Sequence, residues 1–348
     1  MKKRWFAIVV LLIAATFLSA CSSSTLDCTK LEIVCVGLVT GVGKLDDHSF
    51  NQSAWEGIQQ AEEEGLVHLA RTIESVDARD YDENISAFAD AGYDMIVTVG
   101  SAMGQATTAA AEEYPEVYFI GVDQFQEAGA EKPNLAGMVF PEDQASFLAG
   151  ALAAQMTATG KVGAVLGADA YPPVWRYGEG FRAGARYINP EIEVTVAYHN
   201  DADLDKASFD PDWGAMTAYT TIDEGVDVLF GGSGTTGDGA VMAAVQRGIY
   251  AIGAEMDQYY LQPEAAPLLL SSAVKLVSPG IYALIELARD AQAGTGAFAG
   301  GNYSGECSYA PFHDLDSQVP AEVKARMEEI NQGLHEDTIK TDVPPTKP

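Results

Sequence analysis

The sequence has few basic residues and few cysteines for its length of 348 residues. Its 20 Lys and Arg stand against 50 Asp and Glu, which gives a formal net charge of -30 at pH 7. A surface this acidic repels the phosphates of nucleic acids, so nucleic-acid binding is excluded. The four cysteines form neither a CxxC pair nor a Cys/His cluster at zinc spacing. We therefore expect no metal site.

The amino-terminal segment is apolar but too short to cross a membrane. A basic start and an apolar run fill residues 2–17, and small residues then lead to Cys21. Because a hydrocarbon core of about 30 Å requires about 20 apolar residues, we expect cleavage rather than retention. The pattern resembles a bacterial lipoprotein signal peptide over residues 1–20, which predicts lipidation of Cys21 and a polar tether over residues 21–30. An ordinary secretory signal is the alternative.

From residue 32 onward, short β-branched apolar runs alternate with segments of helical periodicity. This alternation predicts an α/β fold with parallel sheets and crossover helices. The series occurs twice, before and after about Phe140, so we expect two doubly wound lobes joined by a hinge. The expected first lobe comprises residues 31–140 and 273–300, and the second comprises residues 141–272 and 301–348. Ligands of such folds bind beyond the carboxyl ends of the strands, in the cleft between lobes.

The loop after the first strand candidate contains the most distinctive motif, Asp-Asp-His-Ser-Phe-Asn-Gln at residues 46–52. Phe-Leu-Ala-Gly at 147–150 and Gly-Phe-Arg-Ala-Gly at 180–184 follow in order, as does Ala-Pro-Phe-His-Asp at 310–314. Together these blocks resemble the basic membrane protein family, the PnrA-like lipoproteins that serve ABC importers as purine nucleoside receptors. The resemblance implies a periplasmic-binding-protein-like type I fold, a nucleoside ligand, and an ABC permease with its ATPase as partners. It also implies a lipid-anchored location on the extracytoplasmic face of the cell membrane.

The resemblance assigns the nucleobase to aromatic and polar residues at strand ends. Its stacking positions fall on Phe50 and Phe209, and one stacked base is worth about 1 to 3 kcal/mol per aromatic face. Asp47, Asn51 and Asp123 stand where donors and acceptors can meet the base edges. The alternatives are that Phe50 belongs to the core and that Asp47 caps the following helix.

The ribose is assigned to a carboxylate, a lysine and a glycine-rich turn. The resemblance places Glu255 where the family has an aspartate, so its longer side chain puts the identity of the sugar in question. Lys275 matches a lysine placed to donate to a ribose oxygen. Gly232 and Gly234 are the expected backbone contacts in the glycine-rich turn at residues 232–237.

The same glycine-rich turn also satisfies the spacing of a dinucleotide fingerprint, with acidic residues about twenty positions further on. An NAD-dependent oxidoreductase is therefore a remote alternative. Nucleotide cofactors are not freely supplied outside the cytoplasm, so we expect a binding protein without a cofactor rather than an enzyme. A receptor that uses another small polar ligand in signalling is the second alternative.

Export also permits a disulfide bond. Cys28 precedes the first strand and Cys307 lies in a glycine-rich segment, so both are expected at the surface and as partners. Cys35 falls within the first strand and is expected to be a buried thiol.

Overall fold

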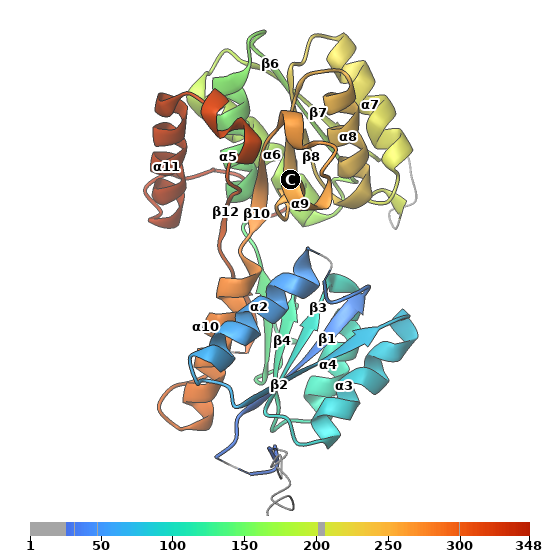
Figure 1. Cartoon of the computed structure of the whole chain (residues 1–348), viewed down its shortest axis with the longest axis vertical. Coiled ribbons are helices and arrows are strands. Elements are labelled where there is room, and N and C mark those ends of the chain that lie inside the picture. Colours follow the sequence, from blue (N-terminus) through green and yellow to red (C-terminus); the bar gives the residue numbers. More distant parts are fainter. Residues whose placement is uncertain (1–25, 31, 47, 201–205, 299) are drawn as a thin grey trace, which may run out of the picture.

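The computed structural model describes residues 26–30, 32–46, 48–200, 206–298 and 300–348. The chain forms two lobes, each with a six-stranded sheet between layers of helices (Figure 1). Their strand orders are β11-β5-β4-β3-β1-β2 and β12-β10-β9-β8-β6-β7, so one arrangement occurs twice. This repetition confirms the predicted fold of two doubly wound lobes.

The first lobe has an entirely parallel sheet. Its strands are β1 (Cys35–Val42), β2 (Leu69–Ser75), β3 (Met95–Val99), β4 (Tyr118–Val122), β5 (Leu135–Val139) and β11 (Gly301–Ser304). Its helices are α2 (Phe50–Glu63), α3 (Tyr81–Asp90), α4 (Gly104–Glu113) and α10 (Val277–Gln292), with 3₁₀ turns at Ala78–Asp80 and Ser101–Met103.

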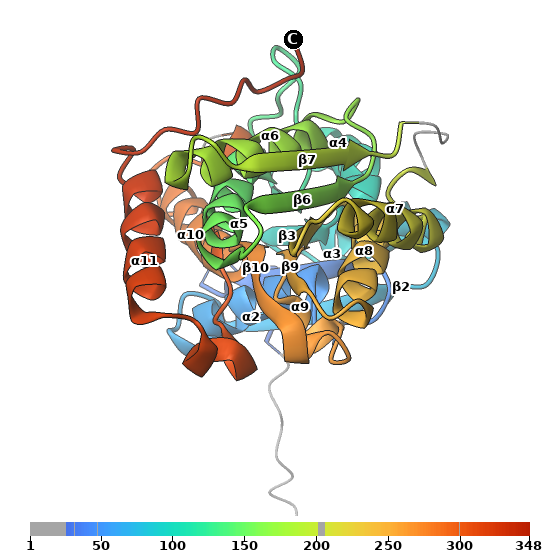
Figure 2. The ribbon, with the colours of Figure 1, turned by 90° about the horizontal axis from the view of Figure 1, so that it is seen from above.

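The second lobe has five parallel strands and one antiparallel edge strand, β12. Its strands are β6 (Lys161–Leu166), β7 (Glu193–Tyr198), β8 (Val228–Gly231), β9 (Tyr250–Glu255), β10 (Leu269–Lys275) and β12 (Cys307–Tyr309). Its helices are α5 (Glu142–Met156), α6 (Pro172–Ile188), α7 (Pro211–Asp223), α8 (Gly234–Gln246), α9 (Gln258–Leu261) and α11 (Ala321–His335), with 3₁₀ turns at Ala266–Leu268 and His313–Gln318. Seen from above, α11 lies on the opposite side of this lobe from α7 and α8 (Figure 2).

Strand β1 shows why the sheets are buried on both faces. Val36 and Leu38 pack toward α2 and α10, whereas Cys35 and Val39 pack toward α3 and α4. A strand that is apolar on both sides is typical of a parallel sheet covered by crossover helices. The core that contains Val36 continues through the hinge into α5 and α6, so one apolar layer runs along both lobes.

Two sequence blocks are explained by close helix packing. A Cβ atom at Gly150 of α5 would lie 2.0 Å from the carbonyl oxygen of Phe181, and one at Gly184 of α6 would lie 1.9 Å from that of Phe147. Only glycine lets the two helix backbones approach this closely. The blocks at 147–150 and 180–184 therefore build the second lobe rather than its ligand site.

The hinge consists of three adjacent crossovers. Gly305 N–H donates to the carbonyl of Val139 at 2.8 Å, and Leu276 N–H donates to that of Glu306 at 2.9 Å. These bonds tie the three passages together. The second and third crossovers fall a few residues later than the expected boundaries, because β10 runs to Lys275 and β11 completes the sheet of the first lobe.

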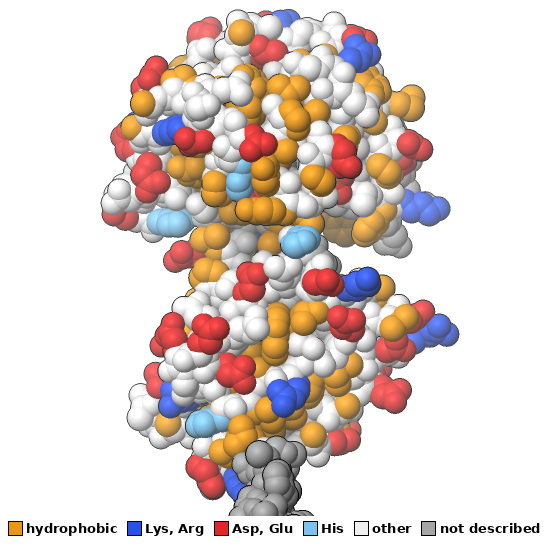
Figure 3. Space-filling view, in the orientation of Figure 1, with side chains coloured by type: hydrophobic (Ala, Val, Ile, Leu, Met, Phe, Trp, Pro, Cys, Tyr) orange, Lys and Arg blue, Asp and Glu red, His pale blue; other side chains and the backbone are white. Residues whose placement is uncertain are grey.

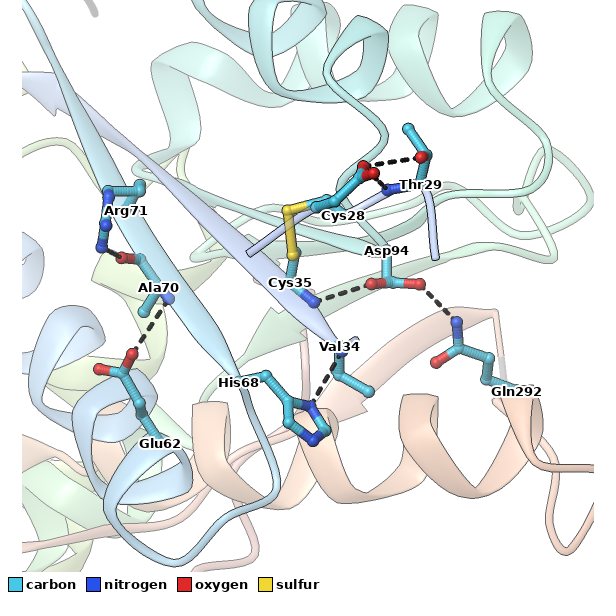
Figure 4. Close-up of a disulfide and its surroundings, with 11 residues drawn as sticks. Cys28, Thr29, Val34, Cys35, Glu62, His68, Ala70, Arg71, Asp94 and Gln292 are labelled. Carbon is cyan, nitrogen blue, oxygen red and sulfur yellow. Dashed lines mark hydrogen bonds between the residues drawn. A yellow bond between two sulfur atoms is a disulfide. The ribbon is translucent and has the colours of Figure 1, made fainter. Parts of the chain in front are cut away.

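The expected disulfide between Cys28 and Cys307 is wrong. Cys28 bonds to Cys35, with 5.7 Å between their Cα atoms, and Cys307 is a free buried thiol (Figure 4). The predicted partners lie in different lobes, since Cys28 precedes β1 and Cys307 begins β12. The expectation that Cys35 is a thiol is also wrong, although its side chain is buried. A turn at Asp27, whose carboxylate accepts a hydrogen bond from the Thr29 hydroxyl at 2.7 Å, brings the two cysteines together.

Within the ranges given above, none of the helices has the length and apolar character needed to span a membrane.

Candidate functional site

Non-glycine residues with left-handed backbone conformation mark the carboxyl ends of three strands. Asp123 follows β4 with a φ of 59°, Ser233 follows β8 with 71°, and Glu255 ends β9 with 69°. Such conformations cost about 1 to 3 kcal/mol each and cluster at functional sites. They locate the candidate site at the strand ends where the lobes face each other, and the molecule is narrowest between the two lobes in Figure 3.

Lys275, the last residue of β10, is the charged centre of this site. Its side chain is 2% exposed, and its Nζ lies 2.9 Å from Asp123 Oδ1 and 3.4 Å from Glu142 Oε1. Burial opposes an ammonium charge, but the charge of Asp123, with that of Glu142, raises the pKa of Lys275 well above its ordinary value. Because Asp123 belongs to the first lobe and Lys275 to the second, this ion pair joins the lobes.

Two phenylalanine rings adjoin the same ammonium. Lys275 Nζ lies 5.7 Å from the ring centre of Phe50 and 5.4 Å from that of Phe140, within the range of cation–π attraction. Phe50 begins α2 and is partly buried against the core. Phe50 therefore lies where a stacking residue is expected, and its ring also packs partly against the core, as the alternative interpretation supposed.

Asn51 is buried and organises the loop between β1 and α2. Its Oδ1 accepts a hydrogen bond from Gly41 N–H at 3.0 Å, and its Nδ2 donates to the carbonyl of Lys44 at 3.2 Å. The amide thus holds backbone groups of the loop that leads to Phe50. Asn51 therefore positions this loop, and its contact with a base edge stays a prediction.

Glu255 and Asp238 form an acidic part of the site in the second lobe. Burial raises the pKa of Glu255, the charge of Lys275 lowers it, and the charges of Asp123 and Asp238 raise it further. Burial also raises the pKa of Asp238 to about 6. Gln262 Nε2 donates to Asp238 Oδ1 at 2.8 Å, which fixes that carboxyl group in place.

Phe209 lies in a short segment before α7 and is 70% exposed. The segment is held to the β8–α8 turn because Thr236 Oγ1 donates to the Ala207 carbonyl and accepts from Asp210 N–H, both at 2.9 Å. Asp210 also caps α7 through Trp213 N–H at 3.0 Å. An exposed aromatic ring is therefore presented next to the glycine-rich turn.

The two predicted glycine contacts lie in this turn for steric reasons. A Cβ atom at Gly234, whose φ is +63°, would lie 2.6 Å from the carbonyl oxygen of Ser208, and one at Gly232 would lie 3.0 Å from Leu166. Helix α8 begins at Gly234, so the motif forms the first turn of the helix. At this helix start, Thr236 N–H donates to the carbonyl of Ser208 at 3.3 Å, which ties the turn to the segment before α7.

Two predicted residues, Asp47 and Cys21, lie outside the described part of the chain. Four residues that the sequence analysis did not select belong to the site: Phe140, Glu142, Arg176 and Asp238. Glu142 was visible only as an acid before an apolar helix, which ordinarily indicates a favourable charge at a helix start. Its burial to 3% exposure could not be read from that pattern.

The described residues contain no group of three or more His, Cys, Asp or Glu that could hold a metal ion.

The two hinged lobes, with polar and aromatic residues at facing strand ends, define a solute-binding protein of the bilobal type. Residues 34–302 match the family described as ABC transporter substrate-binding protein, PnrA-like. The chain belongs to this Bmp family, whose members bind solutes and are not enzymes.

Related sequences cover most of the chain. It is 30% identical to the CD4+ T-cell-stimulating antigen of Listeria monocytogenes over 100% of both chains. It is 30% identical to basic membrane protein A of Borreliella burgdorferi, over 74% of this chain and 73% of that protein. It is 28% identical to the ABC transporter nucleoside-binding protein BmpA of Lactococcus lactis, over 75% and 76%.

Solved structures support the same fold. An ABC transporter solute-binding protein from Aeropyrum pernix superposes with a TM-score of 0.64 at 25% identity, over 88% of this chain and 92% of that chain. One from Conexibacter woesei gives a TM-score of 0.70 at 22% identity, over 90% and 100%. The predicted periplasmic-binding-protein-like type I fold is thereby confirmed.

Proposed function

We propose that this protein is a lipid-anchored extracytoplasmic receptor that binds a nucleoside, with a purine nucleoside as the expected ligand. The ligand lies between the lobes, which close about the hinge and present it to an ABC permease. The observation that carries the proposal is the Asp123–Lys275 ion pair, which joins the lobes 5.7 Å from the ring of Phe50. A flat base and a hydroxylated sugar have complementary chemistry to this combination of aromatic and charged groups.

The roles follow from position and chemistry. The base stacks between Phe50 of the first lobe and Phe209 of the second. Asp123 accepts from the base edge through Oδ2, because Oδ1 is held by Lys275. Glu255 and Lys275 contact the sugar hydroxyls, and the relative from Lactococcus lactis named as a nucleoside-binding protein supports this ligand class.

The direct test is a thermal-shift screen followed by calorimetry, with purine and pyrimidine nucleosides, free ribose and NAD. A bound ligand raises the unfolding temperature according to its concentration relative to its dissociation constant. We expect stabilisation by purine nucleosides and none by ribose or NAD. Stabilisation by a sugar alone would instead favour a receptor for another small polar ligand.

The role of Glu255 is tested with ribonucleosides and their 2'-deoxy analogues. Glu255→Gln removes a charged acceptor, and a hydrogen bond to a charged group contributes about 1.5 to 3 kcal/mol. We expect a larger loss of affinity for the ribonucleoside, because the analogue has already lost one of the paired hydroxyls. Glu255→Asp should also weaken binding, since its shorter side chain retracts the carboxylate. Equal losses for both ligands would move the sugar contact to another acid.

Lipid anchoring is proposed through Cys21. A Cys21→Ser variant should lose incorporation of labelled palmitate and leave the membrane fraction, whereas the unchanged protein should retain both properties. Retention of the variant in the membrane would contradict the anchor.

A further inference from the structure

A continuous chain of polar contacts runs from the carboxyl-terminal segment through the hinge to the first lobe. Thr341 Oγ1 donates to Asp143 Oδ2 at 2.5 Å, and Arg176 Nε donates to Asp143 Oδ1 at 3.0 Å. An Arg176 terminal nitrogen then lies 3.1 Å from Glu142 Oε2. Glu142 Oε1 is 3.4 Å from Lys275 Nζ, which contacts Asp123. The segment that carries Thr341 follows α11 and crosses the α6 side of the second lobe (Figure 2).

Glu142 is the central link in this chain. Its side chain is 3% exposed, and each carboxylate oxygen faces a different cation. Burial raises the pKa of Glu142, whereas the charges of Lys275 and Arg176 lower it. A buried carboxylate is tolerated when it is paired in this way, and removing one partner leaves an uncompensated charge.

The protein contacts of Lys275 use only part of its hydrogen-bonding capacity. An ammonium has three N–H donors, and two acceptors, Asp123 and Glu142, lie within reach here. In the described part of the chain, no third acceptor for Lys275 and no hydrogen bond to Asp123 Oδ2 is present. Lys275 donates to Asp123 Oδ1, and Glu142 faces the ammonium as an ion-pair partner, so donor capacity of the ammonium and Oδ2 of Asp123 remain for a ligand.

We propose that Glu142 and Arg176 are positioning residues for ligand binding: Arg176 orients Glu142, and Glu142 holds the Lys275 ammonium between the lobes. This inference rests on the proposed function, because it concerns how the same site is held. Without Glu142, Asp123 is the one carboxylate among the described residues that remains within ion-pair distance of Lys275, and the ammonium turns toward it. Its remaining donors then no longer point to the ligand.

The test compares five variants of the mature protein by calorimetry with the nucleoside that the wild type binds, and by urea unfolding. Glu142→Gln keeps the shape, but its amide group must face either Lys275 or Arg176 and so breaks one contact. Arg176→Gln removes the next link. The matched control is Arg182→Gln on the same helix, because Arg182 is 27% exposed against 24% for Arg176 and also forms an ion pair, with Glu179 at 3.4 Å.

We expect Glu142→Gln and Arg176→Gln each to weaken binding roughly 2- to 30-fold, as for substitutions along a coupled network. The double variant should bind no more weakly than the single variant with the lower affinity, because the two substitutions interrupt the same chain of contacts. Arg182→Gln should stay within about twofold of wild type, as for a surface substitution. Arg176→Lys should recover part of the loss, since it restores the charge but not the planar fork.

Wild-type affinity in both Glu142→Gln and Arg176→Gln would overturn the inference. Equal losses in Arg176→Gln and Arg182→Gln would also overturn it, because the cause would then be a general weakening of α6. If Glu142→Gln does not fold, the comparison of Arg176→Gln, Arg176→Lys and Arg182→Gln decides alone. A wild-type protein that binds no nucleoside would instead refute the proposed function, and the inference with it.

Discussion

The two lobes share one strand order but are held together by different forces. In the first lobe, the described ion pairs within the lobe, Arg79–Asp77 and Lys132–Glu112, each include at least one exposed group, and a disulfide fastens the start of β1. In the second lobe and the hinge, Glu142 and Lys275 are buried and paired. Exposed pairs contribute about 0 to 1 kcal/mol, whereas a buried pair is costly to break.

This difference indicates that the two lobes contribute different kinds of groups to the site. The first lobe contributes the ring of Phe50 and the carboxylate of Asp123, and its first strand is fastened by the disulfide. The second lobe contributes buried charges beside the hinge, and in the proposed function these charges contact the ligand and take part in closure. The ratio between the change in stability and the change in affinity should therefore differ between substitutions in the two lobes.

The largest effect should follow from Lys275→Met. Removing the ammonium leaves Asp123 and Glu142 close together without a cation between them, and breaking such a buried pair costs about 3 to 5 kcal/mol of stability. Ligand binding should fall by at least about 100-fold, or roughly 2.7 kcal/mol. Urea unfolding and calorimetry measure the two effects. Unchanged affinity would show that the charged region does not contact the ligand. Adding Glu142→Gln to Lys275→Met should restore part of the stability, because it removes one of the two carboxylate charges.

The disulfide should affect the first lobe alone. The bond closes a short loop, with a sequence separation of 7, so its removal by Cys28→Ala/Cys35→Ala should cost roughly 2 to 3 kcal/mol. Affinity should stay within about twofold, because the bond lies at the amino end of β1 and the site at its carboxyl end. Cys307→Ala is the matched control and should respond to reductant as the wild type does. Peptide mapping that finds Cys28 paired with Cys307 would contradict the assignment.

These cysteines also show where sequence reasoning ends. Short apolar runs between segments of helical periodicity were enough to predict both sheets, because burial on two faces leaves a continuous apolar run in each strand. The turn that pairs Cys28 with Cys35 had a weaker local signal, the Asp27 side chain that accepts hydrogen bonds from Thr29. Strand β11 had none that could be used, since four residues rich in glycine and polar groups resemble a loop.

The site divides in the same way. The family resemblance selected aromatic and charged residues at strand ends, and the structure brings Phe50, Asp123 and Lys275 together. The contacts of Glu142 with Arg176 could not be predicted, because they depend on the angle at which α5 and α6 pack. That angle is set by glycines whose role appears only when the helices are in contact.

The two stacking residues provide a finer comparison of the lobes. Phe209→Ala should weaken nucleoside binding by about 1 to 3 kcal/mol with little change in stability, because the ring is 70% exposed. Phe50→Ala should cause a similar loss of affinity and also destabilise the first lobe, since its ring packs partly against the core. Calorimetry and urea unfolding of both variants separate the effects. An unchanged affinity in either variant would remove that ring from the site.

The smallest effect concerns the pH dependence of the second lobe through Asp238. Burial raises its pKa to about 6 from an ordinary value of 3.8, so the folded state binds a proton that the unfolded state has released between these values. Stability should therefore fall as pH rises from about 4 to about 6 and be affected little by this group outside that window. Asp238→Asn removes the charge and keeps an acceptor for Gln262, so at pH 7 it should stabilise the protein by about 1 to 2 kcal/mol after allowance for partial exposure to water. Urea unfolding at several pH values measures this difference, which should disappear near pH 4. A variant less stable than wild type at pH 7 would show that the ionised carboxylate is favoured in the fold, and that its hydrogen bond from Gln262 outweighs the cost of burial.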